Sequence, residues 1–280
     1  MYLRPASLDE ACEALAAAPA AILSGGTDVY PALVERPAPE RWLDISGIGE
    51  LRGIERRGEV VRIGARTTWT EIAKARLPSG FDALRQAARE VGSIQIQNVA
   101  TIGGNLCNAS PAADGVPPLL ALGAEVELAS RAGTRRLPLG GFLLGNRRTA
   151  RRADELLTAI VVPGEMSASR SAFVKLGSRR YLVISIVMAA ANLRLDADGR
   201  VADARIAVGS CSAVACRLPA LEAELVGRPA PAGLGGAVEA RHLAPIAPID
   251  DVRASAGYRG EAAIELVRRA LDTCLEGDRC

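Results

Sequence analysis

The sequence has few of the side chains that build metal sites. Its 280 residues include one histidine, His242, and six cysteines, and no two cysteines form a C-x-x-C pair. Zinc sites and cysteine-ligated clusters need cysteines and histidines at short, regular spacing. We therefore expect no metal or iron–sulfur site within the chain. We also expect reduced thiols, as in a cytoplasmic protein.

An excess of charge of one sign is also missing. Lys+Arg total 34 and Asp+Glu total 32, which gives a formal net charge of +2. This balance removes the electrostatic reason to expect nucleic acid or an anionic membrane as the main partner. The local exception is an arginine-rich stretch from Arg131 to Arg152. It could face a phosphate or an acidic partner subunit, or it could be a solvated surface.

A secretory signal and a long apolar run are absent as well. The N-terminus has no basic segment followed by an apolar core and a cleavage site. The most apolar run extends only from Tyr181 to Leu193, whereas a membrane span needs roughly twenty residues. We therefore expect no membrane segment, and we predict that this run forms a buried strand.

The remaining composition is that of an ordinary soluble globular protein. Hydrophobic residues make up 49% and charged residues 24% of the chain, which is close to average. The length favours two domains, and the change of pattern along the chain places their boundary near residue 170. Strands and helices are intermixed without the strict alternation of a doubly wound parallel sheet, so we predict an α+β fold.

Periodicity, capping residues and turn residues place the individual elements. Capping boxes at Ser7/Glu10 and Thr68/Glu71 predict helix starts, and Gly92 predicts a helix end. The predicted helices cover residues 7–18, 28–35, a segment from 68, 81–92, 218–226 and 257–276. The predicted strands cover residues 21–23, 42–46, a hairpin within 51–65, 125–129, 135–139, 155–163, 170–178 and a hairpin of 181–195 with 200–210.

A glycine pair stands where the first of these strands meets a predicted helix. The stretch is Ser24-Gly25-Gly26-Thr27-Asp28. Glycines at such a junction permit positive φ, and the junction leaves several backbone N–H groups pointing outward. Phosphate is the natural ligand of such a cradle. The alternative is an ordinary turn, because turns use glycine pairs constantly.

A second glycine pair strengthens the ligand interpretation. It lies in Thr101-Ile102-Gly103-Gly104-Asn105 and is followed by Asn108, Ser110 and Asp114 in a short loop ahead of a helix. Two amide cradles in one chain could hold one pyrophosphate together. Neither has the G-x-G-x-x-G pattern, so a Rossmann domain is not predicted.

The two motifs belong to longer segments that follow one another along essentially the whole chain. The segments are SGGTDVYPALVE, WLDISGIGELRGI, RIGARTTWTEIA, VGSIQIQNVATIGGNLCNASPAADGVPPLLALGAEVEL, ELLTAIVVP and APIDDVRASAGYR. Together they resemble the FAD-binding medium subunit of molybdenum hydroxylases, the family of xanthine dehydrogenase and carbon monoxide dehydrogenase. Two glycine motifs that match with their flanks make this resemblance far more specific than either pair alone.

The resemblance implies a fold and a set of FAD contacts. Residues 1–170 would form a vanillyl-alcohol-oxidase (PCMH)-type FAD-binding domain, with subdomains of about 1–55 and 56–170 and FAD extended between them. Residues 171–280 would form a small C-terminal flavoprotein domain of the carbon monoxide dehydrogenase type, with an antiparallel sheet and helices. The implied FAD-binding residues are Leu23, Ser24, Gly25, Gly26, Thr27, Asp28, Val29, Thr101, Gly103, Gly104, Asn105, Asn108, Asp114, Leu157 and Lys175.

The resemblance also implies the chemistry and the partners. In this family the substrate is hydroxylated at a molybdopterin cofactor in a large subunit, and electrons cross two [2Fe-2S] clusters in a small subunit before they reach FAD. This chain would then be an oxidoreductase subunit that passes electrons from FAD to an external acceptor, in an assembly expected to be a dimer of heterotrimers. No side chain of the chain need act as a catalytic group or a metal ligand.

Two departures limit what carries over from the family. The four-cysteine insertion that binds an extra [4Fe-4S] cluster in some relatives is missing, so we expect no such cluster. Relatives that reduce NAD have an acidic pair after their SRR loop. Here Ser178-Arg179-Arg180 is followed by Tyr181-Leu182-Val183, which does not favour NAD as the acceptor. The hydroxylated substrate and the final acceptor stay open.

Two other functions remain as alternatives. A free-standing FAD-dependent oxidoreductase would act directly on a small substrate and would need a catalytic base beside the flavin, for which the sequence offers no candidate. A nucleotide-binding assembly protein would bind FAD without turnover. Single residues also have plain interpretations: Cys107 as a small packed thiol, Trp42 and Trp69 as core residues, and His242 as a surface or capping residue.

Overall fold

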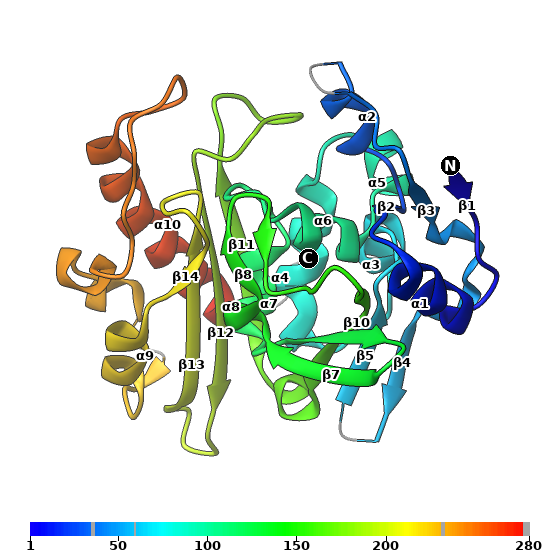
Figure 1. Cartoon of the computed structure of the whole chain (residues 1–280). Helices are drawn as coiled ribbons and strands as arrows, with labels where there is room; N and C mark the ends of the chain where they lie inside the picture. The colour runs from blue at the N-terminus through cyan, green and yellow to red at the C-terminus, as the bar shows by residue number, and fades with distance from the viewer. Residues whose placement is uncertain (35–36, 59, 231–232, 277–280) are drawn as a thin grey trace.

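The computed structural model describes the chain except for residues 35–36, 59, 231–232 and 277–280 (Figure 1). The described strands form a three-stranded parallel sheet, antiparallel sheets of five and four strands, and a two-stranded hairpin. Helices are interspersed with these strands. The predicted α+β fold is therefore confirmed.

Neighbouring strands in each sheet are often distant in sequence. The parallel sheet runs in the order β1 (Tyr2–Leu3), β3 (Trp42–Asp44) and β2 (Ala21–Leu23). The five-stranded sheet runs β4 (Ile54–Arg57), β5 (Val60–Gly64), β10 (Leu156–Pro163), β6 (Glu125–Ser130) and β7 (Gly133–Pro138). The four-stranded sheet runs β11 (Arg170–Leu176), β12 (Val187–Leu195), β13 (Val201–Gly209) and β14 (Cys216–Arg217). The hairpin pairs β8 (Leu143–Gly145) with β9 (Arg148–Thr149).

The described helices lie between the strands along the chain. The α-helices are α1 (Leu8–Ala17), α2 (Val29–Ala32), α3 (Trp69–Lys74), α4 (Asp82–Glu90), α5 (Ile94–Val99), α6 (Ile102–Asn108), α7 (Val116–Ala121), α8 (Leu139–Phe142), α9 (Pro219–Leu225) and α10 (Ala256–Glu276). Short 3-10 turns lie at Ile45–Gly47, Gly49–Leu51, Ser79–Phe81, Gly164–Ala168, Gly235–Ala237 and Ala240–Leu243. None of the helices in the described part of the chain is long and apolar enough to cross a membrane.

The capping residues place the N-terminal helices as the sequence predicted. Ser7 caps α1 by accepting the amide of Glu10. Thr68 and Glu71 form the reciprocal box that starts α3. Such caps satisfy amides that a helix start leaves unpaired, and each contributes about 1 kcal/mol. The box at Thr68 also fixes the direction of α3, which delivers Trp69, a fully buried side chain, to the main core.

The four-stranded sheet is buried on both faces, which explains its apolar central strand. Alternate residues of β12, such as Val187 and Ala189, belong to the apolar cluster formed with α9 and α10. The residues between them, Met188 and Ala190, belong to a second cluster with α4 and α7. Side chains alternate across a strand, so a strand covered on both sides needs apolar residues throughout. Figure 1 shows α10 along one side of this sheet.

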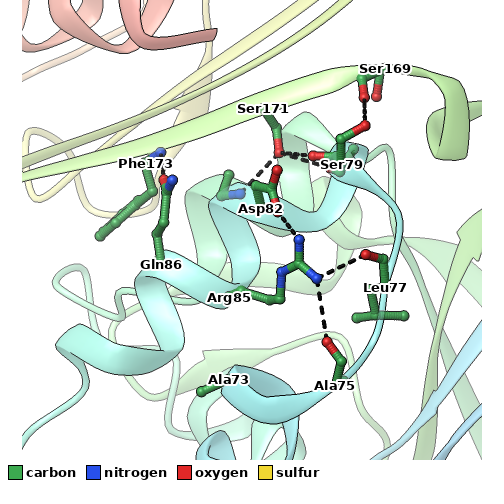
Figure 2. Close-up of polar contacts among 12 residues, drawn as sticks. Ala73, Ala75, Leu77, Ser79, Asp82, Arg85, Gln86, Ser169, Ser171 and Phe173 are labelled. Atoms are coloured by element: carbon green, nitrogen blue, oxygen red, sulfur yellow. Dashed lines mark hydrogen bonds and ion pairs between the residues drawn. The ribbon is translucent and has the colours of Figure 1, made fainter. Parts of the chain in front are cut away.

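A row of hydrogen bonds fastens α4 to β11, as Figure 2 shows. The Ser171 hydroxyl accepts the amide of Ala83 at 2.9 Å and donates to the carbonyl of Gly80 at 2.9 Å. Farther along, the amide of Phe173 donates to Oε1 of Gln86 at 2.7 Å. Because these groups are largely buried, each bond removes the cost of an unpaired polar atom. The position of β11, and of Lys175 near its end, is thereby fixed relative to α4.

The structure corrects the prediction for the apolar run that begins at Tyr181. The predicted strand over 181–195 begins only at Val187, and residues 177–185 form a loop. Leu182 has a φ of 52°, and Arg179 donates to the carbonyls of Tyr181 and Leu182. A positive φ turns the chain out of an extended conformation, and these local bonds replace those of a sheet ladder. Apolar character alone did not reveal this turn.

Candidate functional site

A cavity of about 800 Å³ is lined by both glycine motifs. Its walls come from the end of β2 and from α2, from the segment of α6 and the loop after it, and from the β8–β9 hairpin with the residues that follow. A cavity of this size is typical of a site for a cofactor or a drug-sized ligand. The prediction that the two motifs share one site is consistent with this geometry.

The first motif offers free backbone donors. β2 ends at Leu23, Gly26 has a φ of 73°, and α2 starts when Val29 donates its amide to the carbonyl of Gly26 at 3.1 Å. Within the part of the chain that the structure describes, the amides of Gly25 to Asp28 donate to no protein acceptor. Several free amides in one turn form a concave donor site for an anion. The unpaired amides and the positive φ of Gly26 agree with the backbone geometry predicted for the first pair.

The second motif is organised differently from the prediction. Its residues form α6, a helix that the sequence pattern did not predict, and Thr101 caps this helix. The amide of Gly103 donates to the carbonyl of Ala65 at 2.8 Å, that of Gly104 to Thr101 Oγ1 at 3.1 Å and that of Asn105 to the Thr101 carbonyl at 3.0 Å. These amides are already satisfied. The second motif therefore does not offer these amides to a ligand and is not an amide cradle. It contributes side chains and unfilled space to the cavity wall.

The two motifs touch each other beside the cavity. The hydroxyls of Ser24 and Thr101 lie 3.3 Å apart. A Cβ on Gly25 would lie 2.1 Å from the carbonyl oxygen of Val99, so only glycine permits this contact. Gly25 therefore serves the packing of one motif on the other. The free amides that follow it stand next to the second motif as a result.

The two glycines of the second motif have different surroundings. A Cβ on Gly103 would lie 2.7 Å from both Cβ and the carbonyl oxygen of Ala65, so Gly103 is needed for packing. A Cβ on Gly104 would meet only the Thr101 hydroxyl, at 3.0 Å, and would otherwise project into open space. Gly104 also lines the cavity. Among the described residues, the space beside Gly104 is therefore not filled by protein atoms.

Asp114 is the most elaborately held charge of the cavity wall. Its Oδ2 accepts from Lys175 Nζ at 2.7 Å and its Oδ1 accepts from Ser185 Oγ at 2.7 Å. Burial raises the pKa of Asp114, and the neighbouring Lys175 ammonium opposes this shift. Lys175 also donates to the carbonyl of Glu90 at 3.2 Å, at the end of α4. The carboxylate is thus oriented by three elements of the fold.

Most of the predicted site residues line the cavity. Leu23 and Lys175 do not: Leu23 ends β2 next to the motif, and Lys175 lies behind Asp114. The predicted residues that do line it are Ser24, Gly25, Gly26, Thr27, Asp28, Val29, Thr101, Gly103, Gly104, Asn105, Asn108, Asp114 and Leu157.

Sequence reasoning missed several lining residues. Arg147 and Arg151 are the cations among the described residues of the lining. They come from the arginine-rich stretch, whose other members include Arg135, paired with Glu155, and Arg136, paired with Glu127. The stretch therefore divides into structural ion pairs, cavity residues and exposed arginines, the last being Arg131, Arg148 and Arg152. Charge density alone could not make this distinction.

The thiol and indole groups near the motifs have structural surroundings. Cys107 lines the cavity, and burial raises the pKa of its thiol to about 11. Trp69 lines the cavity as well as the core, and its indole Nε1 has no hydrogen-bond partner among the described residues. His242 is buried and accepts the amide of Glu239 on Nδ1 at 3.0 Å, so it caps a turn and is not among the described residues that line the cavity.

Comparison with known protein families matches nearly the whole chain. Residues 1–165 match the family described as the FAD binding domain in molybdopterin dehydrogenase. Residues 172–274 match the family described as the CO dehydrogenase flavoprotein C-terminal domain.

Similar proteins extend these matches. The xanthine dehydrogenase FAD-binding subunit of Escherichia coli O157:H7 is 35% identical over 265 residues, covering 92% of this chain and 90% of that subunit. The carbon monoxide dehydrogenase medium chain of Hydrogenophaga pseudoflava is 32% identical over 282 residues, covering 97% and 95%. A chain in the structure of reconstituted CO dehydrogenase from Oligotropha carboxidovorans superimposes with a TM-score of 0.90 at 29% identity, covering 98% and 97%.

Proposed function

The chain belongs to the family of FAD-binding domains in molybdopterin dehydrogenases, and from this premise we propose where it holds FAD and with which partners it works. It is the FAD-binding subunit of a multi-subunit molybdenum hydroxylase, and it is therefore an oxidoreductase component. The expectation drawn from the sequence resemblance is confirmed in this respect. The alternative of a free-standing flavoenzyme loses its basis, because the matched relatives are subunits.

We propose that FAD occupies the cavity between the two glycine motifs. The observation that carries this proposal is the run of amides from Gly25 to Asp28, which donate to no protein acceptor in the described chain and stand beside the open space at Gly104. FAD carries a pyrophosphate that needs several hydrogen-bond donors and an extended cavity for its two ring systems. The residues present fit this group. The residues that would hold it are those predicted from the sequence, with Leu23 and Lys175 acting from behind the wall.

The side chains of the cavity divide the work of holding the cofactor. The amides of the first motif would bind the pyrophosphate, and Arg147 would add positive charge to the same cavity. Leu157 and Ile184 present apolar surface that excludes water. Asp114 presents an oriented carboxylate whose direction Lys175 and Ser185 determine. When bound, FAD supplies the redox chemistry that no side chain of the chain provides.

We propose a division into two domains that follows the buried clusters. The C-terminal cluster draws its buried members from residues Ala172 to Cys274. The largest other cluster draws nearly all of its members from Val61 to Val162, and a smaller one gathers around α1, β3 and the turns after it. This supports an FAD-binding domain of residues 1–170, with subdomains of about 1–55 and 56–170, and a C-terminal domain of 171–280.

We propose that the partners are a large molybdopterin-binding subunit and a small [2Fe-2S] subunit, assembled as a dimer of heterotrimers in the cytoplasm. The description of a relative as a medium chain supports a complex with larger and smaller chains. The free thiols of Cys12, Cys107, Cys211, Cys216 and Cys274 support a reducing compartment. Electrons would reach FAD from the clusters of the small subunit and leave to an external acceptor.

Purification of the chain with its neighbours tests this proposal. The tagged chain should co-purify with two other chains, identified by mass, and the visible spectrum should combine flavin and iron–sulfur bands. FAD should be present at about one per copy of this chain. If the chain still carries no flavin after it has been refolded in excess FAD and purified, the assignment of the cavity is contradicted. Flavin without companion chains would contradict the assigned partners only.

A further inference from the structure

The segment APIDDVRASAGYR, residues 247–259, lies outside the cavity lining in the described chain but holds an unusual buried charge. Arg259, in the first turn of α10, is 3% exposed. Its Nη2 pairs with Asp251 Oδ1 at 2.6 Å. Asp251 also accepts the amides of Arg253 at 2.7 Å and Ala254 at 3.3 Å, so the acid is oriented by its own turn.

The other amino group of Arg259 contacts two backbone carbonyls. Nη1 donates to the carbonyl of Ile186 at 2.6 Å and to that of Ser210 at 3.0 Å. Hydrogen bonds from a buried guanidinium are stronger than those between neutral groups. Arg259 thereby ties together two segments that are distant in sequence. Each segment leads to the cavity wall.

The first segment is the loop of residues 177–185. Its base is closed where the amide of Ile186 donates to the carbonyl of Leu176 at 2.8 Å. The residue before Ile186 is Ser185, whose hydroxyl donates to Asp114. The residue before that is Ile184, which lines the cavity. Arg259 therefore holds the end of the loop that places both Ile184 and Ser185.

The second segment is the turn at Ser210, which contacts the loop that carries Asp114. Ser210 has a φ of 63°, and its amide donates to the carbonyl of Pro111 at 3.0 Å. Pro111 lies in the loop between Asn108 and Asp114, which are two of the lining residues. Arg259 donates to the carbonyl of Ser210, and the amide of Ser210 donates to the carbonyl of Pro111. The turn at Ser210 and the loop that contains Pro111 are therefore fixed relative to each other.

We propose that Arg259, oriented by Asp251, is a positioning residue for the flavin site. It fixes the carbonyls of Ile186 and Ser210. Through them it fixes the loop 177–185 and the loop 108–114, which carries Asp114. This inference rests on the proposed place of FAD for its consequence to the flavin. The hydrogen bonds by which Arg259 fixes the two loops are made within this chain and do not depend on where FAD binds.

Tryptic cleavage measures that hold directly, because the loop contains Arg179 and Arg180. The holo complex and the chain without FAD are digested briefly, and cleavage at each arginine is followed by mass spectrometry. Arg259→Ala should speed cleavage after Arg179 or Arg180 by roughly tenfold, the change expected when a charged hydrogen bond that closes a loop is lost. Cleavage in the β4–β5 hairpin, at Arg56 and Arg57, should not change.

Two further variants keep this test decisive. Arg259→Lys retains the charge opposite Asp251 but loses the planar fork that spans both carbonyls, so cleavage should rise by a smaller factor even if Arg259→Ala fails to fold. Arg217→Ala is the matched control: it removes an ion pair with Glu222 in the same part of the fold, and the loop should be cut as in the wild type. Equal cleavage of the loop in Arg259→Lys and Arg217→Ala would overturn the proposal.

A spectroscopic readout connects the hold to the flavin. In the holo complex, Arg259→Lys should change the circular dichroism of the flavin bands and weaken FAD binding severalfold, whereas Arg217→Ala should leave both unchanged. If the wild-type chain binds no FAD, the proposed site fails while the cleavage result still decides the role of Arg259. If FAD binds and neither the spectrum nor the cleavage responds to Arg259→Lys, the positioning role is wrong.

Discussion

The hydroxyls of Ser24 and Thr101 lie 3.3 Å apart and join two glycine motifs that are 77 residues apart in the chain. This contact requires glycine at position 25, where any side chain would meet the carbonyl of Val99. One motif then supplies free amides and the other supplies the wall that faces them. Substitutions of the motif glycines should therefore differ in their effects, because one glycine serves ligand binding and another serves packing.

Gly104→Ala should remove FAD without unfolding the chain. The new methyl group would meet only the Thr101 hydroxyl, which can shift by a few tenths of an ångström, and it would project into the cavity. Alanine also has a better helix propensity than glycine by roughly 1 kcal/mol. We expect flavin content to fall at least severalfold while the thermal midpoint of the apoprotein is unchanged or rises. Flavin absorbance per protein and thermal unfolding measure the two effects.

Two comparison variants separate binding from packing. Gly103→Ala should lower the thermal midpoint, because its methyl group would press on Ala65 and on the backbone there. Gly260→Ala, in α10 with no atom near its Cβ position, should leave the flavin content intact. Full flavin content in Gly104→Ala would show that the space beside Gly104 is not part of the cofactor site.

The buried pair of Lys175 and Asp114 should be worth much more to stability than a surface pair. Their side chains are 6% and 9% exposed and 2.7 Å apart. Lys175→Met leaves the Asp114 carboxylate buried without its counter-charge, which typically costs about 3–5 kcal/mol. Asp114→Asn combined with Lys175→Met should cost less than Lys175→Met alone, because no unpaired charge remains. Chemical denaturation of Lys175→Met, Asp114→Asn and the double variant gives this coupling free energy.

An exposed pair provides the control for this cycle. Arg269 and Glu265 lie 2.7 Å apart on α10, with side chains 65% and 49% exposed. Arg269→Met should change the free energy of unfolding by no more than about 0.5 kcal/mol. A cost for Lys175→Met as small as that for Arg269→Met would mean that water reaches Asp114 freely, and Asp114 would then no longer count as an oriented group of the wall.

The sequence predicted the elements whose signals are local. The capping box at Thr68 and Glu71, the hairpin at 51–65 and the strands on both sides of Gly133 all formed as expected. Such elements depend on residues a few positions apart, so a single sequence contains the information. The α+β fold class followed from the intermixing of strands and helices, and the family followed from the order of longer segments.

The errors concern residues whose conformation is decided by distant partners. The run from Tyr181 is apolar enough for a strand, yet Ser185 bonds to Asp114 and Arg259 holds the carbonyl of Ile186. The cap of Thr101 on the Gly104 amide is a local signal of this helix that the glycine pattern concealed. The amide of Gly103, however, donates to the distant carbonyl of Ala65. Distant partners such as Asp114, Arg259 and Ala65 cannot be inferred from spacing along the chain. The same limit applies to Arg147, which enters the cavity from a hairpin turn with a φ of 56°.

Asp251 should make the stability of the chain depend on pH in the acid range. Hydrogen bonds, first those from its own turn at Arg253 and then the Arg259 guanidinium, lower the pKa of Asp251 from near 3.8 to about 2. The folded state therefore holds the proton less tightly than the unfolded state. The stabilisation is present above about pH 4 and is lost as the pH falls towards 2.

The difference in denaturation midpoint between wild type and Asp251→Asn should be constant from pH 7 to 5 and shrink below pH 4. A difference that grows on acidification would have the wrong sign for a carboxylate of lowered pKa.

Cys107 should report on the occupancy of the cavity through its reaction with an alkylating reagent. Burial raises the pKa of the Cys107 thiol to about 11, so at pH 8 it is almost entirely protonated and reacts slowly with iodoacetamide, since the thiolate is the nucleophile. The rate should rise about tenfold per pH unit until the pH approaches this pKa.

Because Cys107 lines the cavity, bound FAD should slow its reaction further at every pH. The labelling of Cys216, which is outside the lining, should not depend on FAD. Site-resolved mass spectrometry follows both thiols in one sample. Labelling of Cys107 that is equally fast with and without FAD would place the cofactor elsewhere, and fast labelling at neutral pH would show that the thiol is not packed as the structure has it.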